Sequence, residues 1–374
     1  YKSLVPKFEL MHELFELLHK KRKLRGTIDF DLPEAKVVMT QKGEVKEVVA
    51  IERNVAHRII EEFMLLANET VAEHLDKNSI PTLYRIHESP DVNKVEEFKY
   101  FIKTLGHGLD VGRTLVKPKH FQQLIDRVRG TSEERPISSL MLRTMQRARY
   151  DALSLGHFGL GTKYYTHFTS PIRRYPDLVV HRMLRESRQG KLLRKRRENL
   201  TQVLPKIAQQ MSEMERRATE AERQLLQWRK VRFMLDKVGD EFESHVTGVS
   251  SAGVFVELIE HYVEGLVPIS SMADDYYRLI EGDQKLRGEN TKKEYRLGDK
   301  VLVQVVQVNL EKKQIDFGII EILDSIRRKT RPTKVKGRKS KTEKRRSTRP
   351  GRRERSEKRR TKRPKSNRVK GRSK

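Results

Sequence analysis

Residues 156–182 hold the densest set of side chains that could act on a nucleic acid, in the order GHFGLGTKYYTHFTSPIRRYPDLVVHR. A run of aromatic and histidine rings at 164–168 is followed by Ser170-Pro171, and then by Arg173 and Arg174. Because the residue before a proline is pushed out of helical geometry, this order predicts a loop that leads into a helix.

Arginines at such a junction suit phosphate contact, because the guanidinium fork matches phosphate oxygens two at a time. Neighbouring rings could stack on bases. The alternative is a solvated turn whose rings belong to the core, and composition alone favours neither interpretation.

The stretch HFTSPIRRYPDLVVHR resembles the signature of the ribonuclease II/R exoribonuclease family, in its RNB catalytic domain. Three further stretches agree with that family in the same order: RNVAHRIIEEFMLLAN at 53–68, LYRIHESPD at 83–91 and MERRATEAER at 214–223. The resemblance covers residues 1–320. It implies metal-dependent, processive 3′-to-5′ hydrolysis of RNA to nucleoside monophosphates.

The resemblance also implies roles for individual residues. Arg173 would contact the scissile phosphate and stabilise the charge that develops there. Asp177 would pair with an arginine and orient it. The residues expected to shape the RNA channel or lie near the RNA end are Arg174, Tyr175, Asp177, His181, Arg182 and Glu215.

The family uses magnesium, which prefers oxygen ligands such as clustered carboxylates. The closely spaced aspartates that hold it in the family are not found in this chain. Asp29 and Asp31 lie two apart but depart from the pattern, and Asp274-Asp275 reads as a loop. The interpretation is that the chain begins downstream of the Mg²⁺ ligands, so that by itself it would bind RNA and cleave little.

Residues from 240 onward alternate in the manner of a small OB-fold barrel, and GVFVEL, EGLVPIS and LGDKV resemble the S-one RNA-binding domain. Phe255 is the expected stacking ring and Lys300 a backbone contact. Phe242, Tyr262 and Tyr277 could assist or belong to the core, which is favoured for Phe242. Ala252 and Pro268 replace a family aromatic and histidine, which implies weaker stacking.

The predicted fold class is α+β, in three parts. Residues 1–238 form the C-terminal part of an RNB domain, 239–322 the barrel, and 323–374 a disordered Lys/Arg-rich tail. Hydrophobic spacing predicts helices at 4–20, 54–76, 92–105, 118–128, 137–149 and 197–235, and one that follows the signature stretch and ends near Gly190. It predicts strands at 28–32, 36–40, 45–51 and 82–88. Adjacent Glu61 and Glu62 are expected to form salt bridges, and His12 and His19 to pack or be solvated.

Charge is concentrated at the C-terminal end. Residues 327–374 contain 26 of the 80 Lys and Arg residues and 3 of the 51 Asp and Glu residues, so they carry +23 of the net +29. Such a segment favours a polyanionic partner, and DNA, RNA and anionic membranes would all satisfy it. The alternative is a tail that solubilises the chain or associates with the ribosome. No stretch is apolar enough to span a membrane. The absence of cysteine excludes disulfides and thiolate metal sites and is typical of a reducing cytoplasm.

Two other function classes remain open. One is a non-catalytic RNA-binding or RNA-chaperone protein built of a helical platform, an OB barrel and a basic tail. The other is a structural protein that docks on the ribosome through the tail.

Overall fold

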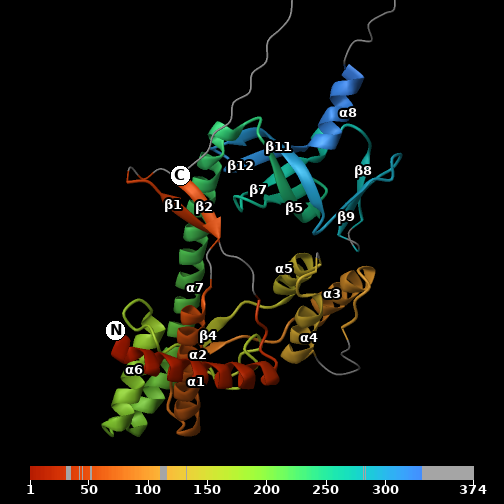
Figure 1. Ribbon diagram of the computed structural model, residues 1–374. Coiled ribbons are helices and arrows are strands. Elements are labelled where there is room, and N and C mark those ends of the chain that lie inside the picture. The colour runs from red at the N-terminus through yellow and green to blue at the C-terminus, as the bar shows by residue number, and fades with distance from the viewer. Residues whose placement is uncertain are drawn as a thin grey trace, which may run out of the picture. The chain divides into compact units, whose positions relative to one another are not determined.

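Two helices open the chain, as the apolar spacing predicts. The computed structural model (Figure 1) describes residues 1–30, 35–41, 43, 45–50, 53–109, 116–131, 133–280, 282 and 284–330. Helix α1 (Val5–Arg25) ends at Gly26, whose φ of 91° is favourable only for glycine. Helix α2 (Val55–Lys77) begins at Asn54, whose side chain accepts a hydrogen bond from the His57 N–H.

The predicted hairpin between these helices is confirmed. Strands β1 (Ala35–Met39) and β2 (Val45–Ala50) pair antiparallel with an irregularity at Val38/Met39. The third strand predicted at 28–32 is not formed over residues 28–30. There the Asp29 N–H donates to the Gln122 side chain instead of to a neighbouring strand. Its last two positions, Asp31 included, lie outside the described residues.

A second small sheet joins distant segments. Strand β3 (Tyr84–Ile86) pairs antiparallel with β4 (Arg149–Asp151). The sequence placed residues up to 149 in a helix, but that helix, α5, covers only Glu134–Thr144. The extended conformation at 149–151 depends on backbone pairing with a strand more than 60 residues away, which local periodicity cannot reveal.

Helices α3 (Val92–Thr104), α4 (Pro118–Val128) and α5 enclose one apolar core. Phe98, Ile102, Phe121 and Met141 are among its fully buried members. A second core lies where α6 (Tyr175–Arg188) and α7 (Arg194–Phe233) meet α2 and β4. Helix α7, drawn in green in Figure 1, is the longest described element and contains Pro205.

The barrel predicted from residue 240 onward is confirmed. Its strands are β5 (Glu241–Ser250), β6 (Gly253–Leu258), β7 (Glu264–Pro268), β11 (Lys300–Asn309) and β12 (Gln314–Ile319). They close in the order β11-β12-β7-β6-β5 around Val254, Val256 and Phe317. Gly253 has φ 142°, and a Cβ there would lie 2.0 Å from the Val267 carbonyl oxygen, so only glycine fits this crossing.

A separate three-stranded sheet, in the order β10-β9-β8, was not foreseen. Its strands are β8 (Tyr277–Ile280), β9 (Lys285–Gly288) and β10 (Glu294–Arg296). Helix α8 (Ile320–Thr330) follows β12 and continues past residue 323, where the tail was predicted to begin. The predicted tail from 331 onward lies outside the described residues. Within the described residues, every helix is too short or too polar to cross a bilayer.

Candidate functional site

The loop that contains the signature is attached to the fold by hydrogen bonds to Asn68 of α2 and to the backbone around β3. The Asn68 amide donates to the Tyr165 hydroxyl at 3.2 Å, and its oxygen accepts from the Phe168 N–H at 2.9 Å. The Thr166 hydroxyl donates to the Leu83 carbonyl oxygen at 2.6 Å, and the Arg85 N–H donates to the Tyr165 carbonyl oxygen at 3.0 Å. Tyr165 is buried, so part of the run of rings at 164–168 belongs to the core, as the alternative interpretation of this segment predicts.

Asp177 is the structural centre of the junction that follows. It lies in the first turn of α6, where a carboxylate is favoured by the helix dipole, and it is fully buried. Its Oδ1 accepts from the Ser170 N–H at 2.8 Å and from Arg174 Nη2 at 2.7 Å. Asp177 therefore orients an arginine, as expected. Because its side chain is fully buried, it supports the loop and is not accessible to RNA, contrary to the predicted RNA contact.

The two adjacent arginines have opposite environments. Arg174 is mostly buried in the pair with Asp177. Arg173 is exposed, and its guanidinium has no hydrogen-bond or ion-pair partner among the described residues. The Arg173 N–H donates to the Ser170 carbonyl oxygen at 3.3 Å, which fixes its backbone within the turn. The loop thus presents one free guanidinium on a backbone held by the buried pair.

The other α6 residues that were predicted to contact RNA also differ, because one supports the loop and two are exposed. The His181 ring stacks on Phe168 with centroids 4.2 Å apart, and its Nε2 donates to the Phe168 carbonyl oxygen at 2.9 Å. His181 therefore supports the loop. Tyr175 and Arg182 are exposed, with the Arg182 guanidinium 6.0 Å from the Tyr175 ring centroid, and they remain available to a ligand.

Glu215 of α7 is connected to this region by Arg85, a residue that sequence reasoning missed. Arg85 Nη1 donates to Glu215 Oε2 at 2.6 Å, and its guanidinium lies 4.8 Å from the Tyr150 ring centroid. The Tyr150 hydroxyl and His167 Nδ1 are 2.8 Å apart. Arg85, Tyr150 and His167 come from three separate segments of the chain, so the sequence does not show that they meet. From the sequence alone, Arg85 is only an arginine in a short predicted strand.

Burial controls the ionisation of this chain of groups. It lowers the pKa of His167 to about 3, with Arg174 and Arg85 adding in the same direction, and it raises the pKa of Tyr150 to about 12. It also lowers the pKa of His157 to about 3. These groups are neutral at neutral pH. The charges left in this region are those of the arginines, Asp177 and Glu215.

The described residues do not form a magnesium site. No group of three or more Asp, Glu or His side chains is placed to hold a metal ion in this part of the chain. Asp29 faces Arg53 at 3.4 Å and Arg22 at 3.8 Å. Glu61 pairs with Arg53 and Glu62 with Arg22, which confirms the salt-bridge prediction. Asp31 lies outside the described residues.

The structure also shows the surroundings of Asp275 and His19, two residues considered from the sequence as possible metal ligands. Asp275 lies in a loop and accepts hydrogen bonds from the Asn290 and Thr291 backbone N–H groups. Desolvation is the largest single effect on its pKa and raises it, but hydrogen bonds from Thr291, Asn290 and Tyr276 together outweigh it and lower the pKa. His19 packs against Phe15 and bonds Glu62, so it is a packed histidine.

The barrel presents a second, simpler candidate surface. Phe255 on β6 is 42% exposed, and Lys300 at the start of β11 is exposed, so both predicted contacts are accessible. Phe242 packs against the barrel core, which confirms the favoured interpretation. Tyr277 is buried beside Tyr295, and Tyr262 is half-buried, which leaves Phe255 as the most exposed of the four rings named for this face.

Two family models match separate parts of the chain. The RNB domain model matches residues 2–189 and the S1 RNA binding domain model matches residues 235–320. The chain belongs to the RNB family.

Curated relatives point to one branch of that family. The chain is 43% identical to ribonuclease R of Aquifex aeolicus over 324 residues, 87% of this chain and 46% of the relative. It is 37% identical to ribonuclease R of Escherichia coli over 327 residues, 86% of this chain and 40% of the relative. The chain thus spans less than half the length of these two relatives.

Solved structures show the same likeness. Mycoplasma genitalium RNase R in complex with ribose-methylated single-stranded RNA matches with a TM-score of 0.81 at 26% identity, over 85% of this chain and 50% of that one. The same enzyme in complex with double-stranded RNA matches with a TM-score of 0.70 at 25% identity, over 85% of this chain and 51% of that one.

Proposed function

We propose that this chain is the RNA-end-binding part of a 3′-to-5′ exoribonuclease of the ribonuclease R type, which hydrolyses RNA to nucleoside 5′-monophosphates. The observation that carries the proposal is the contrast at the loop-to-helix junction. Arg174 is fixed by buried Asp177, while the neighbouring Arg173 guanidinium is exposed and unpaired within the described residues. A free guanidinium on a rigid backbone is suited to stabilise charge that develops on a phosphate.

The proposed mechanism assigns separate tasks to separate residues. Arg173 donates to the non-bridging oxygens of the scissile phosphate as negative charge builds there. Arg174, Asp177 and His181 hold the backbone of the loop, so that little reorganisation is needed during reaction. Glu215, held by Arg85, faces the RNA end, where a carboxylate can accept hydrogen bonds from ribose hydroxyl groups.

Magnesium is part of this proposal, with its ligands supplied by residues other than those described. A bound Mg²⁺ would activate the attacking water and neutralise phosphate charge. The described carboxylates do not fit a metal site, so the tasks assigned above belong to this chain's own residues. A cytoplasmic location, and a contact with the ribosome through the basic tail, are proposed on the sequence alone.

The test is Arg173→Ala in the full-length enzyme. Turnover of a single-stranded RNA should fall by about 10²–10³-fold, while the affinity for RNA changes little, because the guanidinium acts on charge that exists only in the transition state. Arg188→Ala, at the exposed far end of the same helix, is the matched control and should retain full turnover. Equal losses of turnover and affinity would show that Arg173 is only an RNA contact.

A non-catalytic RNA-binding protein is the second candidate. The exposed Phe255 ring and Lys300 on a closed barrel favour it, because they are sufficient for binding without chemistry. Full-length protein that binds RNA but releases no nucleoside monophosphate in the presence of Mg²⁺ would establish this alternative.

A further inference from the structure

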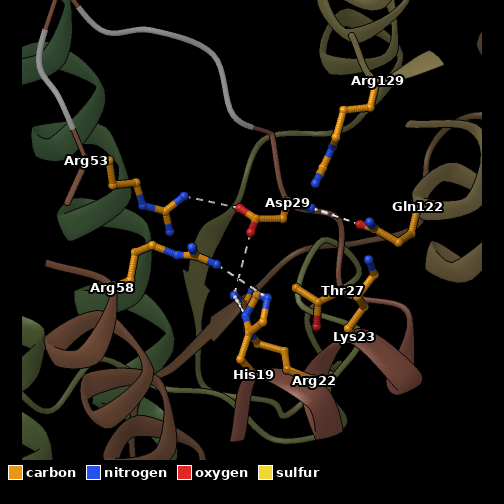
Figure 2. A pocket seen from close by; sticks show the side chains of 9 residues that line it. All are labelled: His19, Arg22, Lys23, Thr27, Asp29, Arg53, Arg58, Gln122 and Arg129. Atoms are coloured by element: carbon orange, nitrogen blue, oxygen red, sulfur yellow. Dashed lines mark hydrogen bonds and ion pairs between the residues drawn. The ribbon is translucent and has the colours of Figure 1, made fainter. Parts of the chain in front are cut away.

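A cavity of about 150 Å³ lies among α1, α4, the start of α2 and the segment 27–30, and none of its lining residues belongs to the signature loop. Figure 2 shows side chains from these four segments around it. The cations that line it are Arg22, Lys23, Arg53, Arg58 and Arg129. Asp29 is the one carboxylate among the lining residues.

Most of these cations already have partners behind the cavity wall. Arg22 bonds Glu62 at 2.7 Å, and Arg53 pairs with Glu61. Lys23 and Arg129 lie 3.7 and 3.8 Å from the Asp126 carboxylate, so their ion pairs are loose. Both side chains are at least half exposed, so they can turn toward a ligand.

Arg58 differs from the other four cations. Its Nη2 lies 3.5 Å from His19 Nε2, and its guanidinium carbon lies 5.4 Å from the Phe15 ring centroid. Among the described residues it has no carboxylate partner. Within the described part of the chain, this half-buried guanidinium, which faces the cavity beside an aromatic ring, is a donor group without an acceptor anion.

Asp29 is the carboxylate that lies between two of the other cations, Arg53 and Arg22. Its two oxygens lie 3.4 Å from Arg53 Nη1 and 3.8 Å from Arg22 Nη2, longer than the 2.7–2.9 Å usual for charge-assisted hydrogen bonds. Its backbone N–H is bonded to Gln122 Oε1 at 3.1 Å, so the main chain is held while the carboxylate is bound weakly. Figure 2 shows the Asp29 side chain between Arg53 and Arg22.

We propose that this cavity is a phosphate-binding site in which Asp29 is the resident counter-ion. Arg58 of α2 and Arg53 just before it bind the phosphate. Lys23 of α1 and Arg129 at the end of α4 add further contacts. The phosphate displaces the Asp29 carboxylate. The volume of about 150 Å³ has room for a tetrahedral phosphate group. The ligand is therefore the phosphate group of a larger molecule, or inorganic phosphate.

Two sources supply such a group: the backbone of bound RNA, and a free phosphate or nucleoside monophosphate. Only the first depends on the proposed function. Binding of free phosphate requires neither catalysis nor Arg173, so failure of the exoribonuclease proposal and failure of this one are distinguishable.

The experiment titrates the full chain with inorganic phosphate and with adenosine 5′-monophosphate by calorimetry, at constant ionic strength set with chloride. A short oligoribonucleotide is titrated in parallel. The variants are Arg58→Ala, Arg58→Lys and Asp29→Asn, with Arg188→Ala as a matched exposed-arginine control. Arg58→Ala should weaken binding about tenfold or more, because a charge-assisted contact is lost, and Arg58→Lys should recover part of it. Asp29→Asn should tighten binding, because the competing carboxylate is gone.

The pattern of effects identifies the source. Changes with phosphate and the monophosphate show a free-anion site, whereas changes confined to the oligoribonucleotide show an RNA backbone contact. If neither ligand class responds to Arg58→Ala or Asp29→Asn, the cavity is an internal ion-pair network and the proposal is wrong. If Asp29→Asn fails to fold, the two Arg58 variants decide alone. A phosphate-dependent rise in the unfolding temperature of the wild-type chain gives an independent readout.

Discussion

The signature loop and the barrel face present their candidate RNA contacts in opposite ways. Around Arg173, one exposed guanidinium stands on buried polar groups, chiefly Asp177 and Asn68, each with specific hydrogen bonds. On the barrel, the exposed ring of Phe255 stands on an apolar core of valines and Phe317. A surface held by a few directional bonds should be sensitive to single substitutions, whereas one held by distributed apolar burial should tolerate them.

The largest difference is expected from removing the buried carboxylate. Asp177→Ala leaves Arg174 buried without its counter-charge and the Ser170 N–H without its acceptor, so the free energy of unfolding should fall by about 3–5 kcal/mol. The measurement is denaturant unfolding of the full chain. Glu220→Ala, which removes an exposed partner of Arg223 on α7, is the control and should change stability little. A small effect of Asp177→Ala would show that the loop is not held by this pair.

On the barrel, the exposed ring should affect RNA binding but not stability, and the packed ring should affect stability but not RNA binding. Phe255→Ala should weaken RNA binding by about 1–3 kcal/mol, because one stacking ring is lost, and leave unfolding nearly unchanged. Phe242→Leu should lower stability and leave RNA affinity unchanged, since that ring packs against the core. Fluorescence-detected RNA titration together with denaturant unfolding measures both quantities. If Phe242→Leu lost RNA affinity and Phe255→Ala did not, Phe242 would be the stacking ring and Phe255 would not.

The last comparison concerns pH, where the effect is gradual and small for each step in pH. Burial lowers the pKa of His167 to about 3, below its usual 6.5, so between these values the unfolded chain binds a proton that the folded chain does not. Stability from this residue is complete above pH 6.5 and is lost as the pH falls toward 3, at up to about 1.4 kcal/mol per pH unit. His167→Gln should flatten the dependence of unfolding free energy on pH between 7 and 5. The exposed His57→Gln should not, and equal slopes in the two variants would contradict the assignment.

Local patterns predicted most helices well, because apolar spacing acts within a few residues. The helix ends that the structure shows at Asn54 and Gly26 are equally local. Local patterns failed at β4, where the pairing partner of Arg149–Asp151 lies in β3. They also missed the β8–β9–β10 sheet, whose strands are only three or four residues long, too short for a clear periodic signal. Strand pairing is a non-local interaction, so a single window of sequence does not contain it.

The candidate site shows the same limit. Arg173 and Asp177 were identified from the order of residues around Ser170-Pro171, and the Asp177–Arg174 pair is local, three residues apart. Arg85, Asn68 and Tyr150 were not identified, because each acts on a residue at least 17 positions away. Asn68, an amide within an apolar helical stretch, is the one of these with a signal in the sequence.

The sequence by itself determined the family, the barrel with Phe255 on its surface, and the arginine pair at the loop-to-helix junction, since all three depend on residue order and alternation over short distances. Only the tertiary structure decided which of the two arginines is free. That choice follows from the burial of Asp177, whose uncompensated charge must be neutralised by the guanidinium that the turn brings within 2.7 Å.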